Sequence, residues 1–152
     1  MSSPPSPRVL GAGVVAWIRD LVAVAAATVA TTAVVFRVWE GPWRVPLIGS
    51  SDGLAQLADM KMIVDTGWYT GTKQLGAPFG LLTYDFPRGG ENFHYVLIKA
   101  LSWFVRDPVL LQNLYFLGGF TLAALAAFIV LRLLGARRIV AGALAIVFAF
   151  AP

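Results

Sequence analysis

The stretch from residue 48 to residue 87 is the part of the sequence around which the rest of the chain is organised. It reads IGSSDGLAQLADMKMIVDTGWYTGTKQLGAPFGLLTYDFP and lies between two long apolar segments. It combines carboxylates and aromatic rings with glycine and proline, whereas a simple connector only has to be soluble and flexible. Loops that carry aromatic side chains and fixed charges together are usually functional sites or lids. We therefore expect the apolar segments to form a membrane frame and this stretch to carry the function.

The composition is that of a membrane protein. Of the 152 residues, 58% are hydrophobic and 13% are charged, whereas soluble domains contain about 25% charged residues. The net charge of +4 comes from arginines that flank the apolar segments, which indicates membrane topology rather than nucleic-acid binding. The sequence contains no cysteine, which excludes disulfides, thiolate metal sites and cysteine nucleophiles.

The first apolar segment predicts a transmembrane helix over residues 19–38. Its uncharged run, residues 21–36, is shorter than the roughly 20 residues that span hydrocarbon, and snorkelling Arg19 and Arg37 make up the difference. Residues 1–18 begin with a Ser/Pro-rich segment and are expected to be disordered or interfacial on the cytoplasmic side. A cleavable signal peptide is the alternative, and the apolar segments downstream favour a retained helix.

A second transmembrane helix is predicted over residues 108–134. Asp107 supplies an N-cap, and Pro108 suits the first helical position. After a tight polar turn, residues 139–152 begin a third apolar helix that is too short to cross a bilayer. The sequence is therefore expected to be the front part of a longer, multi-pass membrane protein.

Residues 39–107 lie between the two spans and are expected to contain two further helices. The helix near residues 52–66 has polar and apolar stripes on several sides, which indicates packing on more than one face. The helix near residues 91–105 is amphipathic and is expected to lie along the membrane surface. Its inward face is predicted to be Phe93, Val96, Leu97, Ala100, Leu101 and Phe104, with Glu91, Asn92, Lys99 and Ser102 opposite. The glycine-rich segment 67–90 is expected to have no regular structure.

The basic residues predict the orientation. Arg132, Arg137 and Arg138 cluster in a short loop, and such loops are cytoplasmic by the positive-inside rule. Arg8 and Arg19 place the N-terminus on the same side. Residues 37–107 are then extracytoplasmic, and the protein is expected in the plasma membrane with the lipid bilayer as its surroundings.

Asp52 and Asp85 are the candidate catalytic residues. Asp52 lies at a helix start, where a carboxylate can act as a general base or hold a divalent cation. Capping of the helix is the alternative role. Pro87 restricts Phe86 to extended conformations, which holds the neighbouring Asp85 on a stiff segment. An Asx-type turn is the alternative there.

Further residues in this region are candidates for binding a substrate: Lys61, Trp68, Tyr69, Arg88 and His94. Aromatic rings stack on sugars or lipids, basic side chains meet a pyrophosphate, and the single histidine can bind a phosphate or shuttle a proton. Each has an ordinary alternative, namely an aromatic belt, a solvated charge or an interfacial histidine. The sequence has no Gly-rich phosphate loop, no cluster of metal-ligating histidines and no Ser-His-Asp spacing.

The order of these segments resembles the N-terminal part of the GT-C class of integral-membrane glycosyltransferases. That order is a short cytoplasmic N-terminus, one helix, a large outer loop that opens with an acidic helix start, a juxtamembrane helix and further spans. Within the class, the runs GSSDGLAQLADM, GWYTGTKQLGAPFG, YDFP and QNLYFL are similar to those of uncharacterised bacterial membrane glycosyltransferases. The resemblance covers residues 45–152.

The resemblance implies an all-α membrane protein with an incomplete GT-C-like fold and a lipid-linked sugar donor, commonly a polyprenyl phosphate. It matches Asp52 to the acidic active-site residue of the first outer loop. Members that use a metal often show Asp-x-Asp, whereas Ser50 takes the first place here, so Mg²⁺ or Mn²⁺ at Asp52 stays an open option. The chain alone is expected to be inactive, because the later helices are missing. A non-catalytic transporter or assembly subunit with a docking outer loop is the alternative.

Overall fold

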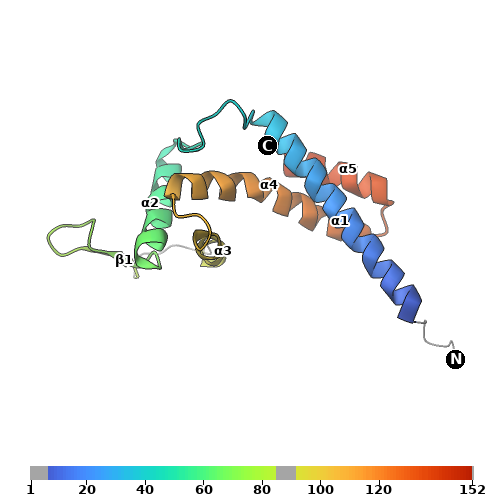
Figure 1. Ribbon diagram of the computed structural model, residues 1–152, viewed down its shortest axis with the longest axis horizontal. Helices are drawn as coiled ribbons and strands as arrows, with labels where there is room; N and C mark the ends of the chain where they lie inside the picture. Colours follow the sequence, from blue (N-terminus) through green and yellow to red (C-terminus); the bar gives the residue numbers. More distant parts are fainter. Residues whose placement is uncertain (1–6, 85–91, 152) are drawn as a thin grey trace. The chain divides into compact units, whose positions relative to one another are not determined.

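A computed structural model of the protein describes residues 7–84 and 92–151. Within these ranges the regular elements are helices apart from one short hairpin, and the expectation of an all-α chain is confirmed (Figure 1). The elements in chain order are α1 (Pro7–Val35), α2 (Ser51–Thr66), β1 (Gly71–Thr72), β2 (Leu81–Leu82), α3 (Asn92–Ser102), α4 (Pro108–Leu133) and α5 (Arg138–Ala149). They form two compact units: a helical unit (Met1–Trp39 with Leu117–Pro152) and a loop unit (Glu40–Phe116).

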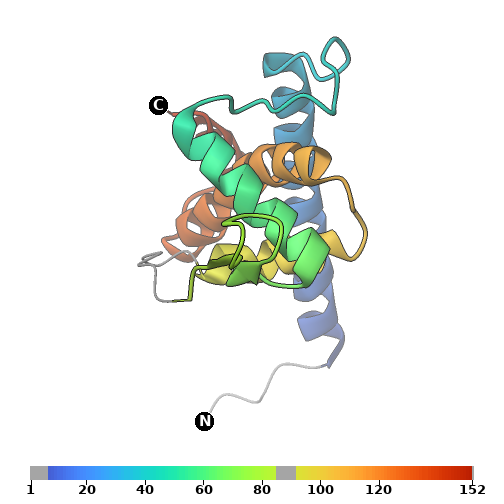
Figure 2. The ribbon, with the colours of Figure 1, turned by 90° about the vertical axis from the view of Figure 1, so that its left-hand side faces the viewer.

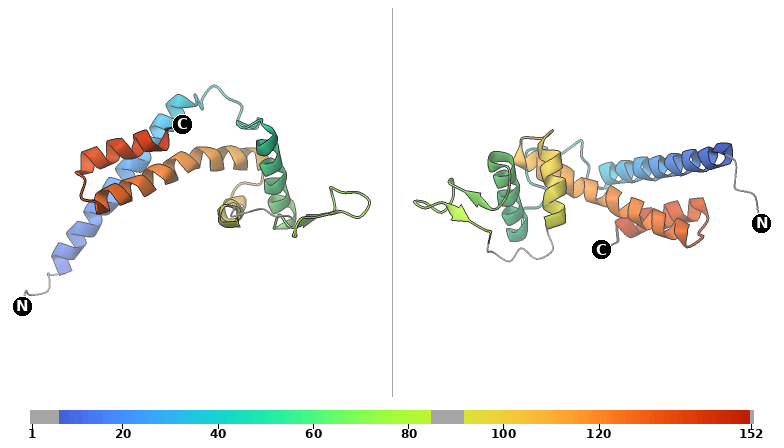
Figure 3. Two further views of the ribbon diagram at one scale, coloured as in Figure 1. Left: turned by 180° about the vertical axis from the view of Figure 1, so that it is seen from behind. Right: turned by 90° about the horizontal axis from the view of Figure 1, so that it is seen from below.

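The helical unit is built from α1, α5 and the C-terminal part of α4 (Figure 3). Its core is small, with Val24 of α1, Ala124 and Phe128 of α4, and Ala141 and Ala145 of α5. The alanines present little side-chain bulk and allow close approach of helix backbones. Most of the remaining apolar surface in this unit stays exposed.

Polar and aromatic contacts at the two ends of the helical unit show how its three helices run relative to one another. At one end Arg138 Nε lies 3.3 Å from Asp20 Oδ2. At the other end the Phe120 ring stacks on Phe150, with centroids 4.9 Å apart, and lies 5.2 Å from the Phe36 ring. These contacts make α1 parallel to α5 and antiparallel to α4.

Two helices are long and apolar enough to cross a membrane, over Gly13–Val35 in α1 and over Pro108–Leu133 in α4. In each, only 11% of the most apolar window is buried within the protein. A core helix of a soluble protein would bury a much larger share of such a surface. Asp107 caps α4 as predicted, because its Oδ1 accepts hydrogen bonds from Val109 N at 2.9 Å and Leu110 N at 3.0 Å.

The helix α1 is longer than predicted. It begins at Pro7 rather than near Arg19, so the part of residues 1–18 that the structure describes is helical. Arg19 and Asp20 do not interrupt it, because charged side chains on a helix surface leave the backbone hydrogen bonds intact. Proline is tolerated in the first turn, where its missing N–H has no partner to lose.

The loop unit has its own core, in which α2 lies against α3 (Figure 2). The buried residues are Met60, Met62, Ile63, Tyr69, Tyr95, Ile98 and Leu111. Leu111 belongs to the second turn of α4, so the start of this helix is part of the same core. The prediction that α2 packs on more than one face is confirmed, since Met60 and Met62, which point to nearly opposite sides of the helix, are both buried.

The face of α3 that packs on the protein core is not the face predicted to meet the membrane. The buried residues are Tyr95, Ile98 and Ser102, and Ser102 was placed on the polar side. Its hydroxyl donates to the carbonyl of Lys99 at 2.7 Å, which permits burial. Phe93 is 68% exposed and Phe104 is 85% exposed. The helix therefore has two apolar faces, one packed on protein and one uncovered within the loop unit.

The segment 67–90 is also more regular than predicted, in the part that the structure describes. Strands β1 and β2 pair antiparallel, with Gly71 opposite Leu82. Gly76 and Gly80 have φ angles of +73° and +84°, which only glycine adopts at little cost. A Cβ atom on Gly76 would lie 2.6 Å from the carbonyl oxygen of Gly80. The glycines thus fold the hairpin loop rather than break the structure.

The two faces of α3 predict different responses to one charge. Ile98 is 2% exposed and Val96 is 57% exposed. Ile98→Asp buries an unpaired carboxylate and should destabilise the loop unit by about 3 kcal/mol or more. Val96→Asp should keep nearly the wild-type unfolding temperature in detergent. Thermal unfolding of the two variants checks this, and equal losses would contradict the assignment of the packed face.

Candidate functional site

Asp52 lies in the first turn of α2, and Ser50 takes the capping role. The Ser50 side chain accepts a hydrogen bond from Gly53 N at 3.4 Å, with the extended backbone expected of an N-cap. The Asp52 side chain is exposed. It makes no hydrogen bond or ion pair within residues 7–84 and 92–151. Asp52 was considered either as a catalytic or metal-binding carboxylate or as the helix cap, and Ser50 is the residue that caps the helix.

Asn113 anchors the irregular segment that leads to α2. Its Nδ2 donates to the carbonyl oxygens of Trp43 and Val45, each at 2.9 Å, and its Oδ1 accepts from Leu47 N at 2.9 Å. The side chain is 1% exposed. One buried amide thus supplies three hydrogen bonds to a backbone that has no helix or strand of its own.

Gln112 holds the turn that carries Asp52. Its Nε2 donates to the carbonyl oxygen of Gly53 at 2.7 Å, and the residue is 1% exposed. A Cβ atom on Gly53 would lie 2.5 Å from Ile48 side-chain and backbone atoms, so glycine is needed at this close approach. No role was predicted for Gln112 or Asn113. The only indication of one in the sequence is that two adjacent amide side chains occur in the first turns of an otherwise apolar helix.

A buried polar and aromatic cluster lies deeper in the loop unit. Tyr95 Oη donates to Asp59 Oδ2 at 2.8 Å, and both residues are at most 2% exposed. The Tyr69 ring stacks on the Tyr95 ring with centroids 4.3 Å apart, and Tyr69 Oη donates to Asn92 Oδ1 at 2.5 Å. The Tyr69 carbonyl accepts from Thr83 Oγ1 at 2.6 Å. Tyr69, predicted to bind substrate, therefore joins α2, α3 and the hairpin as a core residue.

Trp68, Lys61 and His94, the other predicted binding residues that the structure describes, have protein partners as well. Trp68 packs against the loop-unit core, with its ring 5.2 Å from Tyr69. Lys61 Nζ lies 2.7 Å from Asp65 Oδ2 in an exposed i, i+4 pair, a type that contributes about 0.3–0.5 kcal/mol. His94 is exposed, and its Nδ1 forms a hydrogen bond with the Tyr115 hydroxyl, which ties α3 to α4.

The predicted site residues do not gather at one place. Asp52 begins α2 and Trp68 follows its end, and this 16-residue helix is about 24 Å long at 1.5 Å per residue. Asp85 and Arg88 lie outside the described residues. No group of three His, Cys, Asp or Glu side chains that could hold a metal occurs in the part of the chain that the structure describes.

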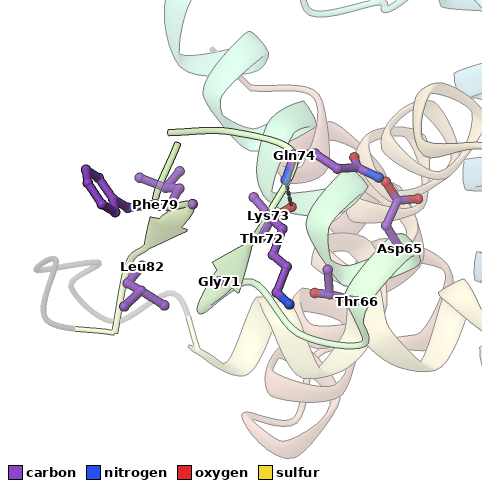
Figure 4. Close-up of a pocket in the computed structure, with 10 residues that line it drawn as sticks. Asp65, Thr66, Gly71, Thr72, Lys73, Gln74, Phe79 and Leu82 are labelled. Atoms are coloured by element: carbon purple, nitrogen blue, oxygen red, sulfur yellow. Dashed lines mark hydrogen bonds between the residues drawn. The ribbon is translucent and has the colours of Figure 1, made fainter. Parts of the chain in front are cut away.

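A cleft of about 540 Å³ lies at the other end of α2, between this helix and the hairpin (Figure 4). Asp65 and Thr66 of α2 line one side of it, and Lys73 and Gln74 come from the hairpin. The Lys73 and Gln74 side chains extend toward the end of α2, whereas Phe79 and Leu82 lie at the outer side of the hairpin. The sequence does not indicate that Asp65 and Gln74 lie close together, because their proximity depends on how the hairpin folds.

The anchoring role of Asn113 predicts a specific local loss of order. Asn113→Ala removes all three hydrogen bonds, and each buried group left without a partner costs about 1–3 kcal/mol. We expect the backbone amides of residues 43–53 to exchange hydrogen much faster, with α5 unaffected. Asn113→Asp keeps the acceptor for Leu47 N but loses both donors, and should give an intermediate effect. Unchanged exchange over residues 43–53 in Asn113→Ala would contradict the anchor.

Comparison with known proteins gives no relative from which a role could be transferred. No protein family, curated protein or solved structure matches the chain. The function is therefore inferred from the residues of the chain itself, and the exposed Asp52 and the cleft at the other end of α2 are the two features on which it rests.

Proposed function

We propose that the protein is part of a membrane glycosyltransferase of the GT-C type, which transfers a sugar from a polyprenyl-phosphate donor on the extracytoplasmic side of the plasma membrane. Two helices long enough to cross a bilayer support it, as does the folded loop unit that lies between them in the sequence. Most of the sequence that resembles this class belongs to the loop unit.

The observation that carries the proposal is the exposed carboxylate of Asp52. The N-cap of α2 is Ser50, so Asp52 in the first turn is not needed as a cap, and its remaining ordinary role is a favourable interaction with the helix dipole. Asp52 is held on a turn that Gln112 ties to α4 through the carbonyl of Gly53. A side chain on a fixed backbone that has no structural partner among the described residues is available to a substrate.

In the proposed reaction Asp52 acts as a general base. The acceptor hydroxyl oxygen forms a bond to the anomeric carbon of the donor sugar, and its proton passes to the Asp52 carboxylate. The bond between the anomeric carbon and the phosphate oxygen breaks, and the polyprenyl phosphate leaves with the electron pair. A positioned base of this kind contributes about 10²–10⁴-fold to the rate.

The residues that the structure describes do not provide a set of protein ligands for a divalent cation. Asp52 would be a single protein ligand, because no other acidic or histidine side chains gather with it in residues 7–84 and 92–151. Mg²⁺ or Mn²⁺ at Asp52 would take its other ligands from the donor phosphate and water. The proton transfer assigned to Asp52 does not involve a metal.

Contacts within the helical unit support the proposed topology. Arg138, which follows α4, pairs with Asp20 in the N-terminal half of α1, and the guanidinium of Arg132 lies 5.6 Å from the Trp17 ring centroid. The turn between α4 and α5 and the N-terminal half of α1 thus share one end. Because basic residues favour the cytoplasmic side, that end is cytoplasmic in the proposal, with α1 and α4 crossing in opposite directions.

A docking role for the loop unit is a second candidate function. The hairpin displays apolar side chains to solvent, with Phe79 94% exposed and Tyr84 72% exposed. Exposed aromatic groups at a surface often mark binding sites for other molecules. A non-catalytic assembly subunit would use the hairpin in this way and would not need Asp52.

Topology is tested with single cysteines, for which the cysteine-free sequence gives no background. Lys73 of the hairpin loop and Arg137 of the turn before α5 are both exposed. We expect an impermeant maleimide to label Lys73→Cys in intact cells and Arg137→Cys only after permeabilisation. Labelling of Arg137→Cys but not Lys73→Cys in intact cells would reverse the proposed orientation.

The catalytic role is tested by comparing Asp52→Asn with Ser50→Ala. Asp52→Asn keeps the size of the side chain but removes the base, so sugar transfer should fall by at least roughly 100-fold with the unfolding temperature unchanged. Ser50→Ala removes the cap, so it should lower stability by about 1 kcal/mol and leave the transfer rate near that of wild type. The assay is transfer from a polyprenyl-phosphate sugar by the native protein in its membrane.

The two variants together separate chemistry from folding. Near wild-type transfer by Asp52→Asn would show that Asp52 is not the base. A lowered unfolding temperature for Asp52→Asn, with Ser50→Ala unaffected, would return the capping role to Asp52.

A further inference from the structure

The cleft between α2 and the hairpin has the chemistry of a ligand site of its own. From its residues we infer that it binds an uncharged, hydroxyl-rich ligand, namely a saccharide unit of the acceptor glycan at a distance from the reacting sugar. The acceptor role rests on the proposed function, whereas the saccharide binding stands on the cleft alone. The volume of about 540 Å³ lies within the roughly 300–1,000 Å³ of small-molecule sites.

The polar side chains of the cleft offer donors and acceptors that protein contacts leave open. Lys73 has three N–H donors and makes no ion pair or side-chain hydrogen bond within the described residues. Asp65 uses Oδ2 for Lys61, which leaves Oδ1 as an acceptor. The single Thr66 hydroxyl proton is shared between the carbonyls of Met62 and Trp68, which lie 2.8 Å and 2.7 Å from Oγ1, so the hydroxyl lone pairs can accept. Together they require a ligand that both donates and accepts.

Hydroxyl groups meet this requirement, whereas charged groups do not. Each hydroxyl donates one hydrogen bond and accepts up to two, so it suits the Asp65 carboxylate and the Lys73 ammonium equally. The Asp65 charge is already balanced by Lys61 at 2.7 Å, so a cationic ligand would gain little there, and an anionic ligand attracted to Lys73 would meet the uncovered Asp65 Oδ1. The Gln74 amide, which both donates and accepts, adds a third group of the same character. The electrostatics therefore favour a neutral ligand.

The apolar part of the cleft fits the other property of a sugar ring, its C–H face. Leu81, Leu82 and Phe79 contribute to the lining, and Phe79 is 94% exposed. The hairpin backbone is fixed, because Phe79 N and Gly80 N both donate to the carbonyl of Gly76, at 3.2 Å and 2.9 Å. The Phe79 and Leu82 side chains lie at the outer side of the hairpin, so Leu81 is the apolar residue of the lining that remains for a ligand in the cleft.

The length of α2 separates this cleft from the proposed reaction centre. Asp65 and Asp52 lie about 20 Å apart along the helix axis, at 1.5 Å per residue. A sugar in the cleft therefore cannot be the one that Asp52 acts on. The cleft would hold a distal unit of an oligosaccharide or polysaccharide acceptor, so binding energy from a remote part of the substrate would position its reacting end.

The inference is tested by saccharide binding to the whole chain in lipid nanodiscs, because glycoside detergents would compete for the cleft. The probes are linear tetrasaccharides of glucose, mannose and galactose, with saturation-transfer-difference NMR as the measurement. At least one should bind to the wild type. Gln74→Ala should weaken binding about 10-fold, whereas Gln56→Ala, an exposed glutamine of α2 outside the cleft, should not.

Each outcome of this experiment decides one point. Absence of binding for all three probes, or wild-type binding by Gln74→Ala, would overturn the inference. Tighter binding of an anionic tetragalacturonate would overturn the neutral class of ligand. Asp52→Asn should bind the tetrasaccharide like the wild type while losing sugar transfer. If the wild-type chain binds the probe but the native protein in its membrane transfers no sugar, the proposed function fails and the saccharide site remains.

Discussion

Two buried side-chain amides at the start of α4, those of Gln112 and Asn113, are the constraint on which the loop unit depends. In an apolar helix such groups cost about 1–3 kcal/mol each when they are left unpaired. The irregular backbone of residues 43–53 supplies their partners. That backbone in turn has few partners in regular structure, so the Asn113 amide and the Nε2 group of Gln112 pair with groups that would otherwise lack a partner. The hydrogen bond from Gln112 to the carbonyl of Gly53 thereby positions the first turn of α2.

The rigid helix α2 gives the loop unit two ends with different chemistry. The N-terminal end presents one carboxylate, Asp52, on a turn that is already capped. The C-terminal end carries the cleft, where Asp65 faces side chains of the hairpin. Because an α-helix has a fixed rise per residue, the sixteen residues of α2 determine the distance between its two ends. In the proposed transferase this spacing separates the reacting sugar from a remote unit of the acceptor.

The helix α3 has two apolar faces, and the core of the loop unit covers only one of them. Tyr95 and Ile98 pack inside the loop unit, while Phe93 and Val96 stay exposed on other sides of the helix. In water an uncovered apolar face of this kind would be unfavourable. A bilayer surface would accept it, which agrees with the prediction that α3 is interfacial. The ordinary pattern of one apolar and one polar face does not describe such a helix.

The sequence by itself determined the helices, because their signals are local. Long uncharged runs, Asp107–Pro108 at a helix start and the change of pattern at Ser50 predicted α4 and α2 closely, and the all-α class with them. Local signals also located Asp52 at the start of α2. They did not show that Ser50 rather than Asp52 is the cap, since both residue types cap helices well.

Only the tertiary structure decided which surfaces meet. The packed face of α3 depends on where α2 and α4 lie, and periodicity cannot distinguish an apolar face that meets protein from one that does not. The pairing of β1 with β2 and the cleft of Lys73 and Gln74 arise from residues separated by a glycine loop whose conformation a single sequence does not reveal. The same holds for the amides of Gln112 and Asn113, whose partners lie about sixty to seventy residues away in the chain.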